Sequence, residues 1–216
     1  MATKTVTRTL ATRTFSGPLT LIRQHGRAYA YLNLMAYGLL VAGMILGALR
    51  PELNAMLTGS MDESGQTGLV VSLLARPWLF ALVILGVNLG KVALGFVTLP
   101  SMVVPFAGIP VFAYWAFTTG IVLAPVDHNT TMTLIPHSLT MVIELQAYVL
   151  LLLGAYVLGL AWVRPASVGV TTRRRAWVRG LRLFGRMWVP ALALFVVGAV
   201  YEAYSLRYLL PLLINS

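Results

Sequence analysis

The chain has 216 residues, of which 58% are hydrophobic and only 10% are charged, and it contains no cysteine. With this few charged residues, a water-soluble domain of this size would have too little polar surface. We therefore expect an integral membrane protein. The net charge of +10 then bears on membrane orientation, and the absence of cysteine excludes disulfides, thiol catalysis and cysteine-ligated metal centres.

In chain order, the apolar runs predict an all-α protein, a polytopic transmembrane helix bundle of about five spans. A bilayer core of about 30 Å needs roughly 20 apolar residues per helix. The run over 77–126 is about twice that length, and Pro100, Pro105 and Pro110 exclude one continuous helix. A re-entrant hairpin over 77–125 stays open as an alternative to two full spans. Within a single membrane domain of residues 1–216, the predicted spans cover 28–49, 77–98, 104–125, 139–163 and 188–210.

The connections between these spans alternate in charge. Basic residues precede the first span and gather between the last two, whereas acidic residues occupy the alternate connections. This positive-inside pattern predicts a cytoplasmic N-terminus and an extracytoplasmic C-terminus. The basic residues before the first span and between the last two are Lys4, Arg8, Arg13, Arg23, Arg27, Arg164, Arg173, Arg174, Arg175, Arg179, Arg182 and Arg186, and the acidic residues of the alternate connections are Glu52, Asp62, Glu63 and Asp127.

The segment 173–187 predicts an amphipathic helix that lies on the cytoplasmic leaflet. An apolar stripe and an arginine stripe recur at helical spacing on opposite faces, which suits the acyl boundary and anionic lipid headgroups respectively. A charge cluster that only sets orientation and a docking surface for a cytoplasmic partner are the alternatives. Nucleic-acid binding is not expected, because orientation already explains the charge. The stripes are Trp177, Leu181, Phe184 and Trp188, and Arg175, Arg179, Arg182 and Arg186.

Two glycine pairs predict close helix packing. Gly43 and Gly47 in the first span, and Gly86 and Gly90 in the second, each place two small residues on one helix face. Such pairs bring helices together within one chain or between two copies of it. We expect contacts within the chain, and a homo-oligomer is the alternative.

Lys91, Glu144 and Glu202 lie inside predicted spans, where a charge costs roughly 2.5–3.5 kcal/mol, so we expect polar partners facing the bundle interior. Counting at 1.5 Å per residue puts both glutamates about 9–12 Å below the outer surface. One interpretation is a network that fixes helix register. The other is a polar cavity, open to the outside, for a partner's residue, an ion or a substrate. The predicted network consists of Asn88, Lys91, Glu144, Gln146, Glu202 and Arg207.

Asp127, His128 and His137 fall in or beside the predicted outer connection 126–137. Their scattered spacing is more typical of an ordinary polar loop than of a metal site. We therefore predict no metal site, no cofactor and no catalytic residue, because no spacing gathers a nucleophile with a base.

Several short segments resemble the stage II sporulation protein M (SpoIIM) family of bacterial membrane proteins. Over roughly residues 30–210, the resemblance includes both intramembrane glutamates and Asn88, although Gln146 stands where the family has a proline. The matching segments are 88–93 (NLGKVA), 114–120 (YWAFTTG), Pro136 with His137, 143–147 (IELQA) followed by Gly154 and Gly159, and 201–204 (YEAY).

The resemblance implies five spans and a non-enzymatic, multi-pass subunit of the bacterial cytoplasmic membrane. It implies a scaffold that anchors or organises partner proteins, either in the membrane or outside the cytoplasm. The alternative is the permease subunit of an exporter driven by a separate ATPase, because the chain itself has no phosphate-binding loop. Under that alternative the arginine helix would contact the ATPase.

Overall fold

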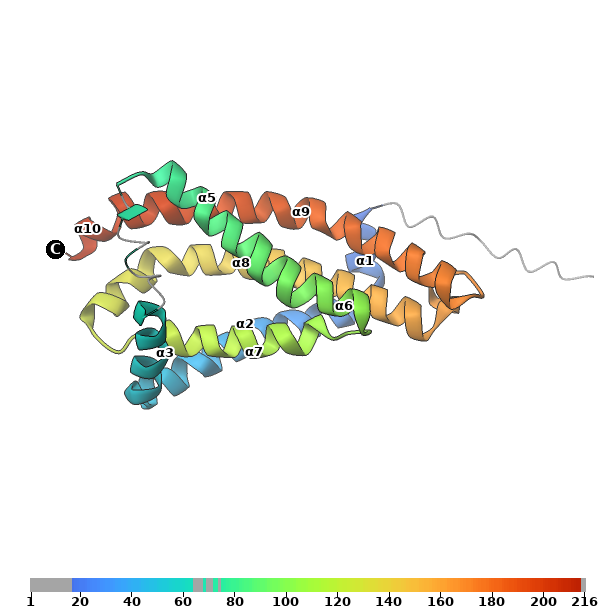
Figure 1. The fold of residues 1–216 in the computed structure, drawn as a ribbon, viewed down its shortest axis with the longest axis horizontal. Helices are drawn as coiled ribbons and strands as arrows, with labels where there is room; N and C mark the ends of the chain where they lie inside the picture. Colours follow the sequence, from blue (N-terminus) through green and yellow to red (C-terminus); the bar gives the residue numbers. More distant parts are fainter. Residues whose placement is uncertain (1–16, 64–67, 69–71, 74, 215–216) are drawn as a thin grey trace, which may run out of the picture.

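The computed structural model describes residues 17–63, 68, 72–73 and 75–214, and these form helices and short connections without a strand. Figure 1 shows an elongated bundle in which α8 and α9 run side by side along its length. The elements are α1 (Pro18–Gln24), α2 (Gly26–Leu49), α3 (Pro51–Glu63), α5 (Pro77–Val87), η1 (Asn88–Thr98), α6 (Leu99–Val103), α7 (Gly108–Val122), α8 (His128–Val163), η2 (Pro165–Val168), α9 (Arg173–Tyr208) and α10 (Leu210–Ile214).

The helical fold is the predicted one. Four continuous helices within the described residues are long and apolar enough to cross a membrane, namely Gly26–Leu49, Pro77–Val103, Thr130–Val163 and Arg173–Tyr208. The predicted span 104–125 is the shorter apolar helix α7 of 15 residues. At 1.5 Å per residue α7 measures about 22 Å, which is less than a bilayer core needs.

Helix α7 ends early because another segment satisfies its last carbonyl groups. Helix α3 forms where the sequence predicts only an outer connection, and it lies across the end of the bundle (Figure 1). The buried Asn54 side chain of α3 donates hydrogen bonds to the carbonyls of Ile121 and Val122, at 2.8 and 3.1 Å. The end of a helix leaves such carbonyls unpaired, and inside apolar surroundings an unpaired carbonyl is costly.

The elements α5, η1 and α6 follow one another without a break and form one continuous helical segment from Pro77 to Val103. The expected interruption near residue 98 is therefore wrong. An eleven-residue π-helix precedes Pro100. Proline has no backbone N–H group, and its ring clashes with the preceding turn of an α-helix, so the wider turns of the π-helix accommodate it. The hydroxyl of Thr98 also donates to the carbonyl of Ala93 at 2.7 Å.

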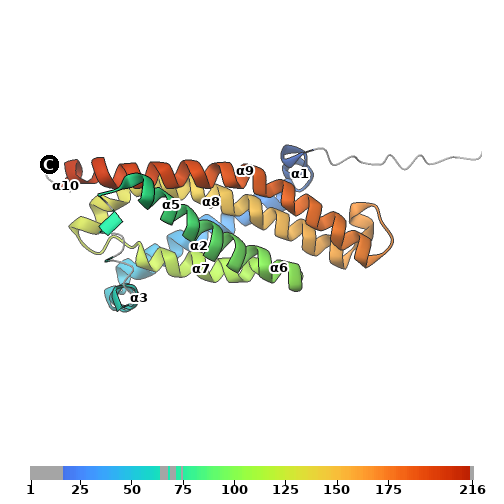
Figure 2. The same ribbon diagram turned by 45° about the horizontal axis from the view of Figure 1, so that its top comes forward.

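The turn 104–107 then reverses the chain in the half of the bundle where α8 ends and α9 begins, short of the connection between those two helices (Figures 1 and 2). Phe106 adopts a left-handed conformation with a φ of 67°, and its ring packs against Gly159 and Tyr156. Because Gly159 is near the end of α8, the chain passes along the bundle twice rather than turning back midway. The choice between two full spans and a re-entrant hairpin therefore depends on whether the short helix α7 crosses the membrane.

Helices α8 and α9 each have 36 residues, so each extends about 54 Å and exceeds a bilayer core. Helix α8 begins at His128, eleven residues before the predicted start at 139, and continues through Pro136. Its start is fixed by a capping box. Asp127 Oδ1 accepts from the Thr130 amide at 2.7 Å, and Thr130 Oγ1 accepts from the Asp127 amide at 3.1 Å.

The predicted interfacial helix 173–187 is wrong as a separate element, because α9 continues from Arg173 to Tyr208. Small residues let this segment pack against α8 instead of turning along the membrane surface. Gly180 lies against Ala161 and Leu158, and Phe184 lies over Gly154. Phe184 is therefore buried between helices rather than facing the acyl boundary.

One of the two glycine pairs packs as predicted. Gly43 and Gly47 of α2 lie directly against the backbone of α7, and Gly120 of α7 lies in turn against Leu40 and Gly43. By contrast, a Cβ at Gly86 or Gly90 would meet no described atom within 4 Å. The first pair therefore forms a contact within the chain, whereas the second lies on an exposed helix face.

Helix α1 lies beside α9, and α2 runs from there toward the end of the bundle where α3 lies (Figures 1 and 2). Lys4, Arg8 and Arg13 fall outside the described residues. Helices α1 and α2 meet at His25, whose ring packs edge-on against Tyr156 with 5.9 Å between centroids. Burial lowers the pKa of His25 below its ordinary value, so its neutral form is favoured at pH 7.

We predict that Gly43→Ala destabilises the protein by about 1–3 kcal/mol, because the new methyl group would press on the α7 backbone. Its Cβ would lie 3.0 Å from Gly120 Cα and from the Ile121 amide nitrogen, and even closer to the Phe117 carbonyl oxygen. Thermal unfolding in detergent micelles measures the loss. The matched control is Gly86→Ala, which meets open space and should leave stability unchanged. Equal stability of the two variants would contradict the α2–α7 contact.

Single cysteines test the path of the chain, since the protein has none of its own. We expect cysteines at Val104 and Thr172, both exposed, to react with an impermeant maleimide from the same side of the membrane. A cysteine at the exposed Ser60 on α3 should react from the opposite side. Labelling of the Val104 position from the Ser60 side would show that the 77–122 segment re-enters instead of crossing.

Candidate functional site

A cavity of about 430 Å³ lies among α2, α5, η1, α7, α8 and α9. Helix α5 and its continuation cross obliquely over α8 (Figure 1), and Trp115 and Thr119 of α7 also line the cavity. Apolar side chains such as Phe80, Leu123 and Met141 form much of its wall. The polar and aromatic residues that line it are Asn88, Lys91, Trp115, Thr119, His137, Glu144, Tyr148 and Glu202.

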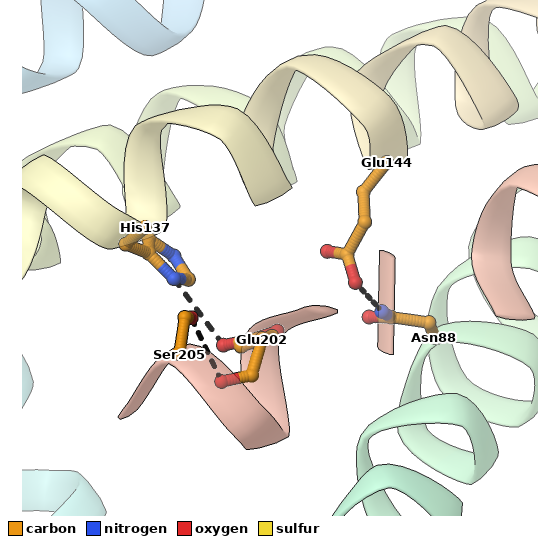
Figure 3. A network of polar contacts seen from close by, with 5 residues as sticks. All are labelled: Asn88, His137, Glu144, Glu202 and Ser205. Carbon is orange, nitrogen blue, oxygen red and sulfur yellow. Dashed lines mark hydrogen bonds and ion pairs between the residues drawn. The ribbon is translucent and has the colours of Figure 1, made fainter. Parts of the chain in front are cut away.

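Glu144 is held by a chain of hydrogen bonds from two helices. The Asn88 amide on η1 donates to Glu144 Oε1 at 2.6 Å, and the Tyr148 hydroxyl donates to Asn88 Oδ1 at 3.0 Å. Glu144 and Tyr148 are four residues apart on α8, so they share one helix face. Figure 3 shows the other carboxylate oxygen of Glu144 pointing away from Asn88, toward the side of His137 and Glu202.

Glu202 forms a second polar pair in the same cavity. Its Oε1 lies 3.3 Å from His137 Nδ1, and both side chains are largely buried, with 14% and 17% exposure (Figure 3). The Ser205 hydroxyl donates to the backbone carbonyl of Glu202 at 3.1 Å and leaves its carboxylate free for other partners. When His137 is protonated, this pair is an ion pair. When His137 is neutral, it can be a hydrogen bond.

Both glutamates line one cavity, as predicted, but they do not lie at equal depth. Glu144 packs against Gly198, whose Cβ position is 2.9 Å from Glu144 Cγ, and Gly198 is one helical turn before Glu202. Glu202 instead faces His137, two turns before Glu144. The two glutamates are therefore offset from each other along the bundle by about one helical turn.

Two predicted members of the network do not pair with the glutamates. Lys91 lines the cavity rim but is exposed and forms no ion pair with any described residue. It lies within the π-helix, where residues three apart no longer share a face as in an α-helix, so it is turned away from Asn88. Arg207 is exposed, with its guanidinium 6.0 Å from the Tyr208 ring centroid. It is five residues from Glu202, which is about 140° around the helix.

Gln146 belongs to a different polar cluster that joins α8 to α2. Tyr29 Oη donates to Gln146 Oε1 at 2.8 Å, and Gln146 Nε2 donates to Asn33 Oδ1 at 2.6 Å and Tyr37 Oη at 3.0 Å. Because Gln146 is two residues from Glu144, the two side chains point to opposite faces of α8. Sequence proximity therefore placed Gln146 in the wrong group.

The sequence analysis missed Tyr148, and it placed His137 in an outer connection. Tyr148 is 1% exposed and packs against the rings of Phe112, Trp115 and Phe195, with centroids 5.2, 5.2 and 4.8 Å away. In the sequence, the only indication that Tyr148 belongs to the site was its position one helical turn after Glu144. Thr140 is also fully buried, and its hydroxyl has no hydrogen-bond partner within the described part of the chain.

This arrangement suits a positively charged group that carries an apolar body. Glu144 and Glu202 supply two carboxyl groups, which attract a cation when they are ionised, and Trp115 and Tyr148 supply aromatic surface, which also attracts cations. Apolar walls with a few convergent polar groups are typical of small-ligand sites. No three His, Asp or Glu side chains of the described residues gather closely enough to hold a metal ion.

Comparisons with models of protein families, with curated proteins and with solved structures found no match for the chain. The protein is an all-α bundle of apolar helices, as in a membrane protein, with two glutamates on one interior cavity.

We predict energetic coupling between Asn88 and Glu144, because their hydrogen bond joins η1 to α8. In a double-mutant cycle of Asn88→Ala and Glu144→Ala, we expect about 0.6 kcal/mol, and up to about 1.7 kcal/mol, of interaction free energy. Unfolding in micelles measures it. The matched cycle of Gln146→Ala with Asn88→Ala should be additive, because Gln146 faces α2. Additivity in both cycles would contradict a structural role for the Asn88–Glu144 contact.

Proposed function

We propose that the protein is a non-enzymatic membrane subunit whose interior cavity binds a cationic group with an apolar body. The observation that carries this proposal is that Glu144 and Glu202, from two different helices, line one aromatic and apolar cavity. Placing a carboxylate inside the membrane costs free energy, so a cavity that holds two carboxyl groups is a strong candidate for a functional site. A cationic occupant would offset that cost in the bound state.

The proposal gives the cavity residues different tasks. Glu144 is oriented by Asn88, and Glu202 by His137, so each carboxylate presents its charge in a fixed direction. Lys91 at the rim carries the same sign of charge as the occupant and opposes its entry. Trp115 and Tyr148 contact the cation or its apolar substituents.

The resemblance to the stage II sporulation protein M family supports a role as a subunit of a larger assembly. In that role the occupant is a lysine or arginine side chain from the transmembrane helix of a partner, and the protein acts as a scaffold. The second candidate is the permease subunit of an exporter driven by a separate ATPase. The cavity supports that candidate too, because an apolar organic cation as substrate would need the same lining.

We further propose that the arginine-rich end of the bundle is cytoplasmic, in a bacterial cytoplasmic membrane. Arg23, Arg27, Arg164 and the arginines in the first four turns of α9 support this orientation, as do Glu52 and Asp127 in the outer connections. It gives the α6–α7 turn a cytoplasmic position and α3 an extracytoplasmic one. Labelling of the Thr172 and Ser60 cysteines in intact cells tests the orientation.

Binding of benzyltrimethylammonium by the purified protein tests the cavity. We expect Glu144→Gln and Glu202→Gln each to weaken binding about tenfold, and Lys91→Gln to strengthen it, because each changes one charge at the cavity. Isothermal titration in detergent micelles measures the affinity. Glu52→Gln is the matched control, since Glu52 is exposed on α3. The uncharged isostere neopentylbenzene should bind weakly and without dependence on these glutamates.

Affinity purification in mild detergent separates the two candidate roles. Recovery of an ATPase would favour the permease role, and recovery of membrane or extracytoplasmic proteins without an ATPase would favour the scaffold. In either case, Glu202→Gln should reduce recovery or transport while the protein still inserts and remains monodisperse. Unchanged cation affinity in both glutamate variants would overturn the assignment of the cavity.

A further inference from the structure

A second concave site lies at the N-terminal end of α9, away from the acidic cavity. It is a groove of about 690 Å³ along the first turns of the helix, and Val170 of the connection that precedes α9 also lines it. Arginines alternate along it with apolar side chains, so it offers charge and apolar surface together. The lining residues are Val170, Arg174, Arg175, Val178, Arg179, Arg182, Leu183 and Arg186.

The protein itself offers this groove almost no negative charge. The sequence contains no acidic residue between Glu144 and Glu202. Arg174, Arg175, Arg179 and Arg182 form no ion pair with any residue in the described ranges. Five arginines in one groove repel one another, and an anionic ligand would relieve that repulsion.

Four of the five arginines fall into two pairs along the helix. Arg175 and Arg179 are four residues apart, as are Arg182 and Arg186, so each pair can hold one anion between neighbouring turns. The centres of the pairs are seven residues apart, which is about 10.5 Å along α9. Arginine suits phosphate because its planar group donates two parallel hydrogen bonds. Two separated phosphate groups therefore fit the groove better than one.

The position of the groove favours a lipid over a soluble anion. The apolar part of α9 begins directly after Arg186, so the groove starts where this helix becomes apolar. Val170, Val178 and Leu183 add an apolar strip between the arginine pairs. A lipid headgroup can enter such a groove while its acyl chains stay in the bilayer.

We propose that this groove is a binding site for an anionic phospholipid that carries two separate phosphate groups. One phosphate lies between Arg182 and Arg186 near the membrane boundary, and the other lies between Arg175 and Arg179. The site is independent of the acidic cavity, because it uses other residues and the opposite charge. It also gives the arginine stripe a specific ligand, in place of a general attraction to negative lipids.

Full-length protein in lipid nanodiscs tests the site. We compare nanodiscs that contain diphosphatidylglycerol with nanodiscs that contain phosphatidylglycerol at the same total negative charge, and measure thermal stability and retained lipid by native mass spectrometry. We expect the two-phosphate lipid to be retained roughly tenfold better. Replacing Arg175, Arg179, Arg182 and Arg186 by Gln should abolish that preference. A size-exclusion profile that matches the unmodified protein shows that the variant is folded.

The matched control removes four charges from the same end of the bundle but outside the groove. Replacing the exposed Arg23, Arg27, Arg164 and Arg173 by Gln should weaken general attraction to negative lipids but keep the preference for two phosphates. Equal effects of the two quadruple variants would overturn the proposal, because retention would then follow charge alone. Displacement of the lipid by inorganic diphosphate at constant ionic strength would also overturn it, since the groove would then be a site for soluble anions.

Discussion

The close antiparallel contact between α8 and α9 is the interaction on which the rest of the structure depends. Three glycines make room along it, because Phe184 lies over Gly154, Leu158 lies against Gly180, and Glu144 lies against Gly198. These contacts fix the register of the two helices. The register in turn sets which residue of α8 faces Glu202, and it leaves the arginines of α9 on the exposed side.

Polar groups inside the bundle join helices that are otherwise apolar. Asn88 and Tyr148 connect η1 with α8, Gln146 connects α8 with α2, and Asn54 connects α3 with the end of α7. In apolar surroundings an unpaired polar group costs several kcal/mol, so each of these side chains specifies which helices must meet. The His137–Glu202 pair differs because it borders an open cavity, where an occupant can exchange partners with it.

The acidic cavity and the arginine groove have opposite charge and lie at different positions along α9. Glu202 is near the end of this helix, and the arginine groove covers its first four turns. A long continuous helix keeps the two apart, so a cation in one and a phosphate in the other would not compete. The same helix gives both sites a rigid support, which suits binding more than loops would.

The sequence alone determined that the protein is an all-α bundle of apolar helices, because composition and run length follow directly from the needs of a bilayer. It also identified Asn88, Glu144 and Glu202, since a polar residue inside an apolar run can be recognised without knowing where the helix begins and ends. Only the tertiary structure decided that Gln146 leaves this group, that His137 joins it, and that 173–187 continues into the last span. Those facts depend on helix ends and on rotation about the helix axis, where a shift of a few residues turns a side chain to another neighbour.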